Sequence, residues 1–101
     1  MKKAPSYDLD EIKELLKSED TRIVSQRDRL EAVRLGYADD EEMVRRVLKL
    51  VDTDFHKTMP SIIYPSMMQD VYYTRDGATR LYIKLQISFN GKGVIISFKE
   101  A

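Results

Sequence analysis

The sequence predicts an α+β fold in which N-terminal helices pack on a C-terminal antiparallel β-sheet. Two observations predict it. Apolar residues in the first half recur at helical spacing, whereas those from Leu81 to Phe89 alternate with polar residues, as they do in a strand. The chain of 101 residues has the size of one domain, which we expect to span residues 1–101.

The first helix is predicted by the capping pair Asp8 and Glu11, which precedes a face of apolar residues at helical spacing. We expect this helix to end near Lys17–Glu19. A short extended segment is expected at Arg22–Val24.

Two further helices are predicted by their caps. Ser25 can cap a second helix that runs to about Leu35, where Gly36 can adopt the left-handed conformation that ends many helices. Asp39 can cap a third helix, whose first turn is acidic, as the helix dipole favours. The buried stripe of this third helix is predicted to contain Met43, Val44, Val47, Leu48 and Val51.

The second half of the chain is predicted to form strands. The alternating strand from Arg80 to Phe89 is followed by Asn90-Gly91, the dipeptide most typical of a tight hairpin. The return strand is predicted to bury Val94, Ile96 and Phe98 and to present Ile95, Ser97 and Lys99 on its other face.

Two more strands are predicted upstream of this hairpin. One runs from Gln69 to Arg75 and ends at a turn marked by Asp76-Gly77, and a shorter one covers Phe55–Met59. The loop bracketed by Pro60 and Pro65 is not expected to be regular.

Composition excludes several classes of protein. The chain has no cysteine, so it can form neither disulfides nor thiolate metal sites. Its one histidine, His56, has no carboxylate at ligand spacing, so we expect no metal and no cofactor. No apolar run follows Met1-Lys2-Lys3 and none reaches the length of a membrane span, so we expect a cytoplasmic protein with no signal peptide and no membrane contact.

The open face of the predicted sheet carries cations and aromatic rings. The net charge is zero, yet from Lys57 onward 6 Lys and Arg stand against 3 Asp and Glu. The residues expected on this face are Gln69, Arg75, Tyr82, Lys84, Gln86 and Lys99. Such side chains can hold the phosphates and stack the bases of single-stranded RNA, but they are also ordinary on a solvated sheet face, so both interpretations remain open.

A catalytic version of this face would cleave RNA through its own 2′-hydroxyl. His56 has the intrinsic pKa of a general base, and Lys57 beside it could hold the phosphate. However, neighbours on a regular strand point to opposite faces, so both can face the substrate only if the strand is irregular. A lone histidine is also often structural.

Four spaced blocks carry a resemblance to a known family. They are Asp54–Met59, Met68–Tyr72, Leu81–Lys84 and Ile96–Glu100. In these blocks the sequence resembles the MqsR toxins, which belong to the wider RelE-like group of mRNA interferases. The resemblance covers essentially the whole chain, and its specific part lies between Asp54 and Glu100.

The resemblance implies a RelE-like fold and a metal-independent, sequence-selective endoribonuclease that cleaves mRNA at GCU-type sites. It also implies an MqsA-like antitoxin that carries its own zinc and a DNA-binding domain, so that the toxin itself would not bind DNA directly. The family's functional lysine, glutamine and tyrosine fall on Lys57, Gln69 and Tyr82, and its C-terminal basic position falls on Lys99. His56 departs from the family pattern, which has tyrosine there.

On this basis Lys57, Tyr82 and Gln69 are the predicted catalytic residues. We expect Lys57 to stabilise the phosphate charge, Tyr82 to orient or protonate, and Gln69 to position the nucleotide. The predicted substrate-binding residues are His56, Arg75 and Lys99. Lys84 is given no role beyond solvated charge.

Two alternatives remain open. One is a non-catalytic RNA- or protein-binding module that uses the same face, and the other is a structural protein whose basic face meets an acidic partner. For the antitoxin, the edge of the Phe55–Met59 strand is one candidate docking surface.

Overall fold

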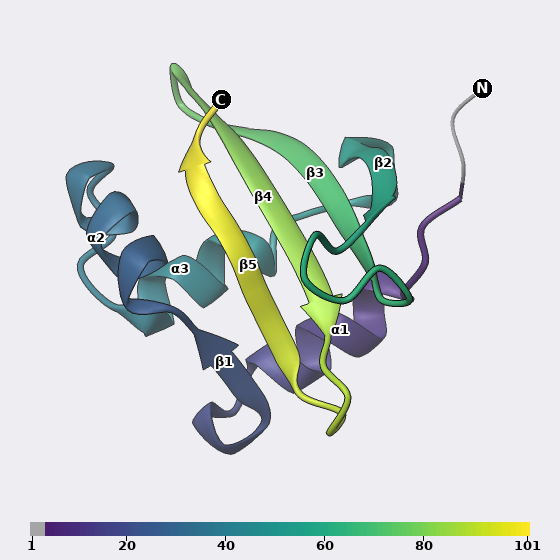
Figure 1. Ribbon diagram of the computed structural model, residues 1–101. Helices are drawn as coiled ribbons and strands as arrows, with labels where there is room; N and C mark the ends of the chain where they lie inside the picture. Colours follow the sequence, from purple (N-terminus) through teal and green to yellow (C-terminus); the bar gives the residue numbers. More distant parts are fainter. Residues whose placement is uncertain (1–3) are drawn as a thin grey trace.

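The computed structural model describes residues 4–101 and places one layer of helices against a β-sheet (Figure 1). Met1 to Lys3, where a signal peptide would begin, lie outside the described residues. The α-helices are α1 (Leu9–Leu16), α2 (Gln26–Arg34) and α3 (Asp40–Val47). The strands are β1 (Arg22–Val24), β2 (Phe55–Pro60), β3 (Met68–Asp76), β4 (Thr79–Ile87) and β5 (Gly93–Glu100). The predicted α+β class is confirmed.

The helices begin where their capping residues predict. The side chain of Asp8 accepts hydrogen bonds from the backbone of Asp10 and Glu11, Ser25 caps α2, and Asp39 caps α3. Gly36 follows α2 with a φ of 96°, the left-handed conformation expected there.

The third helix ends earlier than the apolar stripe predicted. Its last residue is Val47, and the chain turns at Leu48. Because of this turn Leu50 becomes fully buried, whereas Val51 is 55% exposed. The prediction that Val51 belongs to the buried stripe is therefore wrong.

The sheet is mixed rather than purely antiparallel. Its strand order is β1-β5-β4-β3-β2, and β1 pairs with β5 in parallel while the other pairs are antiparallel. The segment expected to be merely extended becomes a strand because Arg22 anchors it from a buried position, donating to the Leu16 carbonyl oxygen at 3.1 Å and pairing with Glu41.

The core lies between the helices and one face of the sheet. Figure 1 shows α1 and α3 behind the strands, while α2 lies beside β5. Leu81, Ile83 and Leu85 of β4 are fully buried, as their alternation predicts. Helix α1 comes so close to Gly93 of β5 that a Cβ added to this glycine would lie 2.9 Å from the Cβ of Leu15. The opposite face of the sheet stays open. No helix in the described part of the chain is long and apolar enough to cross a membrane.

The hairpin from β4 to β5 departs from simple alternation at two points. The register of β5 shifts between the pairs Lys84↔Ser97 and Leu85↔Ile95, so that Ile96 is an extra residue. The predicted burial of Val94 and Ile96 is therefore wrong, because Ile95 is the residue that enters the core with Phe98. Phe89 lies beyond the end of β4 and is 72% exposed instead of continuing its apolar face.

Candidate active site

A bulge in β2 turns His56 and Lys57 toward the same side of the sheet. Phe55 pairs with Tyr72 and Lys57 pairs with Val71, so His56 is an extra residue between them. The ring of Phe55 packs in the core, 5.7 Å from that of Tyr72. The regular strand that would have separated His56 from Lys57 is not formed, and both side chains are exposed on the open face.

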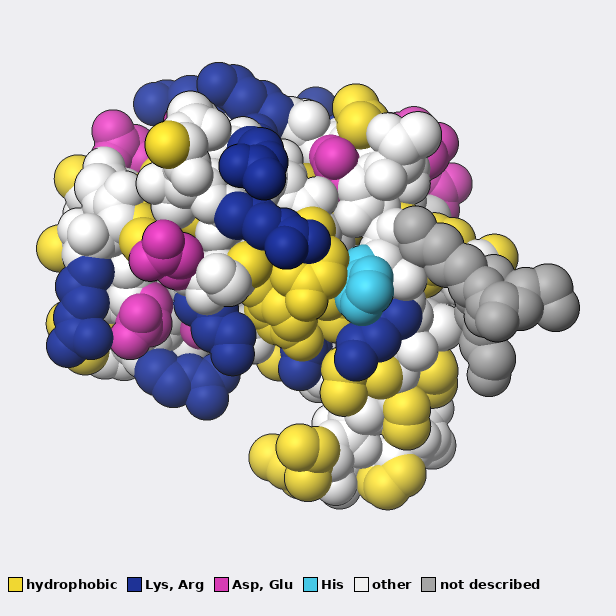
Figure 2. Space-filling view, turned by 90° about the horizontal axis from the view of Figure 1, so that it is seen from above, with side chains coloured by type: hydrophobic (Ala, Val, Ile, Leu, Met, Phe, Trp, Pro, Cys, Tyr) yellow, Lys and Arg dark blue, Asp and Glu magenta, His cyan; other side chains and the backbone are white. Residues whose placement is uncertain are grey.

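An aromatic row crosses this face. The rings of His56 and Tyr73 are 4.8 Å apart, and those of Tyr73 and Tyr82 are 5.6 Å apart. The guanidinium of Arg80 lies 4.4 Å from the centre of the Tyr73 ring, and the Lys99 Nζ lies 5.0 Å from that of Tyr82. In Figure 2 the histidine, in cyan, borders a hydrophobic patch that has Lys and Arg side chains on both sides.

A second row beside the first holds two lysines. The register aligns Lys57, Val71, Lys84 and Ser97 across four strands. Val71 is fully buried although it lies on the open face and outside the main core cluster, so the side chains around it cover it. Lysine stems commonly cover apolar surface in this way while the ammonium stays in water.

Lys84 is the most perturbed cation of this surface. Partial burial lowers the pKa of its ammonium, and the like charges of Lys99, Lys57 and Arg27 lower that pKa further. Among the described residues, no carboxylate forms an ion pair with Lys57, Lys84 or Lys99. The cluster therefore carries positive charge that a bound anion would compensate.

The remaining predicted site residues lie one row further out. Gln69 is buried, and its side-chain N–H donates to the Oε1 of Gln86 at 3.0 Å, so it is held in place beneath the lysine row. Arg75 lies at the opposite end of β3, near the β3–β4 turn, and stands opposite Arg80 in the strand register. Since alternate residues of a strand are about 7 Å apart, these two outer rows are separated by roughly 20 Å.

The strand positions thus place all six predicted site residues on one face, four of them in the two central rows, while Arg75 also lines a pocket beside α3 with Arg46 and Lys49. Sequence reasoning gave no role to four more, Lys84, Tyr73, Arg80 and Arg27. Tyr73 lies an even number of residues from Gln69 and Arg75, and Arg80 lies two residues before Tyr82. Strand alternation therefore places Tyr73 and Arg80 on the open face as well. Arg27 belongs to α2 and donates to the Ile96 carbonyl oxygen at 3.1 Å, a placement that no local pattern indicates.

In the part of the chain that the structure describes, no three His, Asp or Glu side chains gather as metal ligands. The chemistry available on the face is that of ammonium, guanidinium, imidazole, amide and phenol groups.

The fold and this face are those of a small α+β protein with an open sheet surface of cations and aromatic rings. The chain belongs to the family described as motility quorum-sensing regulator, toxin of MqsA, whose model matches residues 4–100. This confirms the resemblance seen in the sequence and assigns the chain to the toxin side of a toxin–antitoxin pair. A search of curated proteins found no match.

Proposed function

We propose that this toxin is an endoribonuclease that cleaves single-stranded messenger RNA, without a metal ion and with a preference for GCU-type sites. The observation that carries the proposal is the unpaired cluster of Lys57, Lys84 and Lys99 around the aromatic row. Single-stranded RNA offers both phosphates for the ammonium groups and unpaired bases for the rings. With mRNA as its substrate, the protein would act in the cytoplasm.

The proposed reaction needs no external nucleophile. The 2′-oxygen attacks the adjacent phosphorus, a P–O2′ bond forms, and the P–O5′ bond breaks. A base takes the 2′ proton and an acid returns a proton to the departing 5′-oxygen. Negative charge grows on the non-bridging oxygens, and Lys57 and Lys84, aligned across Val71, would stabilise it.

The other side chains take roles that follow from their places. The ring centre of Tyr82 lies 5.8 Å from the Lys84 Nζ and 5.0 Å from the Lys99 Nζ. Tyr82 would therefore orient the substrate or donate the proton to the 5′-oxygen. Gln69 is a positioning residue, and Lys99 and Arg75 would bind flanking phosphates. His56, whose ring meets that of Tyr73 edge to face, would stack on a nucleobase of the RNA or assist as a general acid.

The second component of the proposal is the partner. An MqsA-like antitoxin would restrain the toxin and would make any DNA contact on its behalf. β2 is the outermost strand of the sheet, so its edge is a candidate for pairing with a strand of the antitoxin.

A defined RNA incubated with the purified protein in EDTA tests the enzyme, with Lys57→Ala beside the wild type and the cut sites mapped. We expect the substitution to reduce cleavage by about 10²–10³-fold, the usual loss when one charge-stabilising group is removed. Its stability should stay within about 0.5 kcal/mol of the wild type, because Lys57 is exposed. Lys49→Ala, an exposed lysine of the helical layer, is the matched control.

Two results would count against the proposal. Cleavage by Lys57→Ala at the wild-type rate would remove the role given to that lysine. RNA binding without cleavage by either protein would favour the non-catalytic binding module, which spreads its affinity over many contacts and tolerates the loss of one.

A further inference from the structure

Four large apolar side chains stand exposed beyond the end of the site. Ile62 is 91% exposed, Ile63 77% and Tyr64 56%, all in the loop between β2 and β3, and Phe89 in the β4–β5 turn is 72% exposed. The rings of Tyr64 and Phe89 meet edge to face, with centres 5.5 Å apart. Contiguous exposed apolar groups of this kind mark interaction sites.

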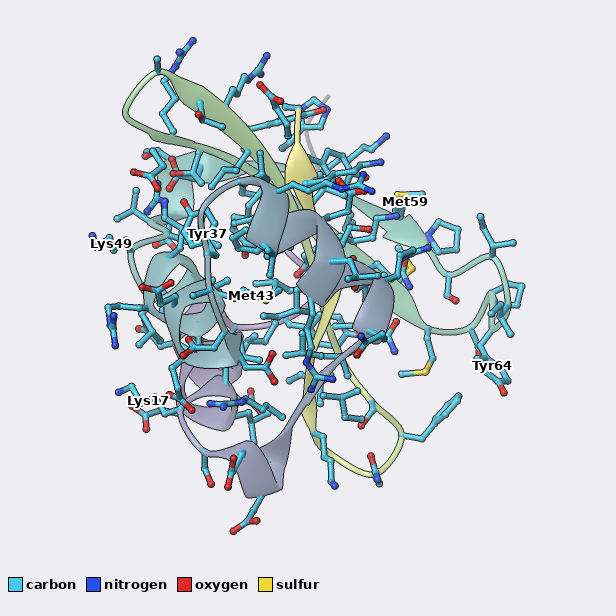
Figure 3. All side chains as sticks on the ribbon, turned by 90° about the vertical axis from the view of Figure 1, so that its left-hand side faces the viewer. Lys17, Tyr37, Met43, Lys49, Met59 and Tyr64 are labelled. Atoms are coloured by element: carbon cyan, nitrogen blue, oxygen red, sulfur yellow. The ribbon has the colours of Figure 1, made fainter. Side chains whose placement is uncertain are left out.

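The loop holds Tyr64 in a defined position. The backbone N–H of Tyr64 donates to the Ser61 Oγ at 3.2 Å, and the backbone N–H of Met67 donates to the Tyr64 carbonyl oxygen at 2.8 Å. Met67 also contacts the site, since its sulfur accepts a hydrogen bond from the Gln86 Nε2 at 3.8 Å. Figure 3 shows Tyr64 at the outer end of this loop, far from Tyr37 and Met43 in the interior.

The aromatic pair lies beyond the rows, in the direction in which β4 runs. Phe89 follows Lys84 by five residues along the same chain segment, which is roughly 16 Å for an extended backbone. An RNA strand whose scissile phosphate lay at Lys57 and Lys84 would reach the pair only several nucleotides away from the cut.

The charge of the surroundings favours a polyanion over an apolar partner. No Asp or Glu occurs between Phe55 and Gln69 or between Gly77 and Lys99, whereas Lys92 lies in the same turn as Phe89. Exposed rings on segments that carry a lysine and no carboxylate are suited to binding single strands, which offer bases to the rings and phosphates to the cation.

We propose that Tyr64 and Phe89 form a stacking platform for an unpaired base of the bound RNA, several nucleotides from the scissile phosphate. This inference rests on the proposed function, because it takes the same RNA strand as its ligand. The platform would favour substrates that are unpaired on one side of the cleavage site and would add to the sequence preference.

Binding rather than cleavage tests the platform. RNAs that lack the attacking 2′-hydroxyl are compared by fluorescence anisotropy: a short one limited to the cleavage triplet, and two of about ten nucleotides, extended on the 5′ or the 3′ side. The Tyr64→Ser/Phe89→Ser protein is set beside Ile62→Ser/Ile63→Ser, which removes exposed apolar side chains of the same loop but no ring.

We expect the loss of the two rings to weaken binding of one extended RNA by about 5- to 100-fold and to leave the short RNA unaffected. The isoleucine variant should bind all three RNAs as the wild type does. If the wild type binds the extended RNAs no better than the short one, or if both variants weaken binding equally, the platform is overturned.

Two further outcomes separate this inference from its basis. If the ring variant binds RNA normally but fails to bind the antitoxin, the patch belongs to a protein interface and the platform is overturned. If the ring-dependent gain is present while the wild type cleaves no natural RNA, the platform is supported and only the ribonuclease proposal fails.

Discussion

Replacing Lys84 by methionine should stabilise the fold while reducing RNA cleavage. Methionine keeps an unbranched stem of similar length beside Val71, the residue opposite Lys84 in β3, but removes an ammonium that is partly buried among like charges. A residue that costs stability where it stands and is needed for activity is typical of a functional site.

The register of the strands sets the size of the effect. By the spacing of the strands, the backbone positions of Lys57 and Lys84 are two strands apart, about 9.6 Å. The backbone position of Lys99 is one strand and two residues from that of Lys84, roughly 8 Å. We take these spacings as the separations of the charges. Two unit charges about 9 Å apart in water repel each other by roughly 0.5 kcal/mol. For the two pairs together this amounts to about 0.7 kcal/mol in 0.01 M salt and about 0.3 kcal/mol in 0.15 M salt. The gain from relieving the burial of the charge adds to these values.

Thermal unfolding at the two salt concentrations measures this gain. For a domain of this size the Tm of Lys84→Met should rise by about 3–5 °C at low salt and by about 1–2 °C at physiological salt. Because the pKa of Lys84 is lowered in the folded state, the cost of its charge is fully present at neutral pH and shrinks as the pH rises through that lowered pKa. The difference in Tm should therefore shrink at alkaline pH.

A matched control removes a lysine from the opposite setting. Lys17 pairs with Glu14 at 2.6 Å on the surface of α1, so Lys17→Met should leave the Tm unchanged or slightly lower. A Tm of Lys84→Met equal to or below that of the wild type at low salt would refute the repulsion argued here. Unchanged cleavage would refute its role in the site.

Two other substitutions test the surrounding structure. In the wild type we expect kcat/KM to fall at alkaline pH, because Lys84 loses its proton below the usual lysine pKa. In Lys84→Arg the guanidinium stays charged at high pH, so this fall should move to higher pH. Identical pH profiles would exclude Lys84 as the source of the fall. Gly93→Ala should destabilise the protein by about 1–3 kcal/mol in chemical unfolding, because the new Cβ would meet that of Leu15 at 2.9 Å; a stability equal to that of the wild type would mean that α1 can shift without cost.

The features that could be predicted from the sequence are those with local causes. Asp8, Ser25 and Asp39 cap helices because a side-chain oxygen meets backbone N–H groups two or three residues away. Alternation along β4 separates Leu81 from Tyr82 without reference to any other strand. The parallel pairing of β1 with β5 depends instead on contacts far apart in the sequence, and no local pattern indicates it.

The two bulges explain why the flanks of the site were harder to predict than its centre. With Phe55 opposite Tyr72, a regular β2 would place Lys57 opposite Asp70 on the helix side; the bulge moves it opposite Val71, in line with Lys84. With Ile95 opposite Leu85, a regular β5 would turn Lys99 toward the helices; its bulge sets Lys99 opposite Tyr82.

Neither bulge contains a glycine, so neither has the local marker that often identifies such a site. Each inserts one residue into a strand and thereby reverses which side chains beyond it face the open surface. The central strand β4 can bring Tyr82 and Lys84 to that surface alone, but Lys57 and Lys99 reach it only because β2 and β5 each contain one extra, bulged residue opposite the strand with which they pair. The positive charge of the site is therefore a property of the strand register as much as of the residues themselves.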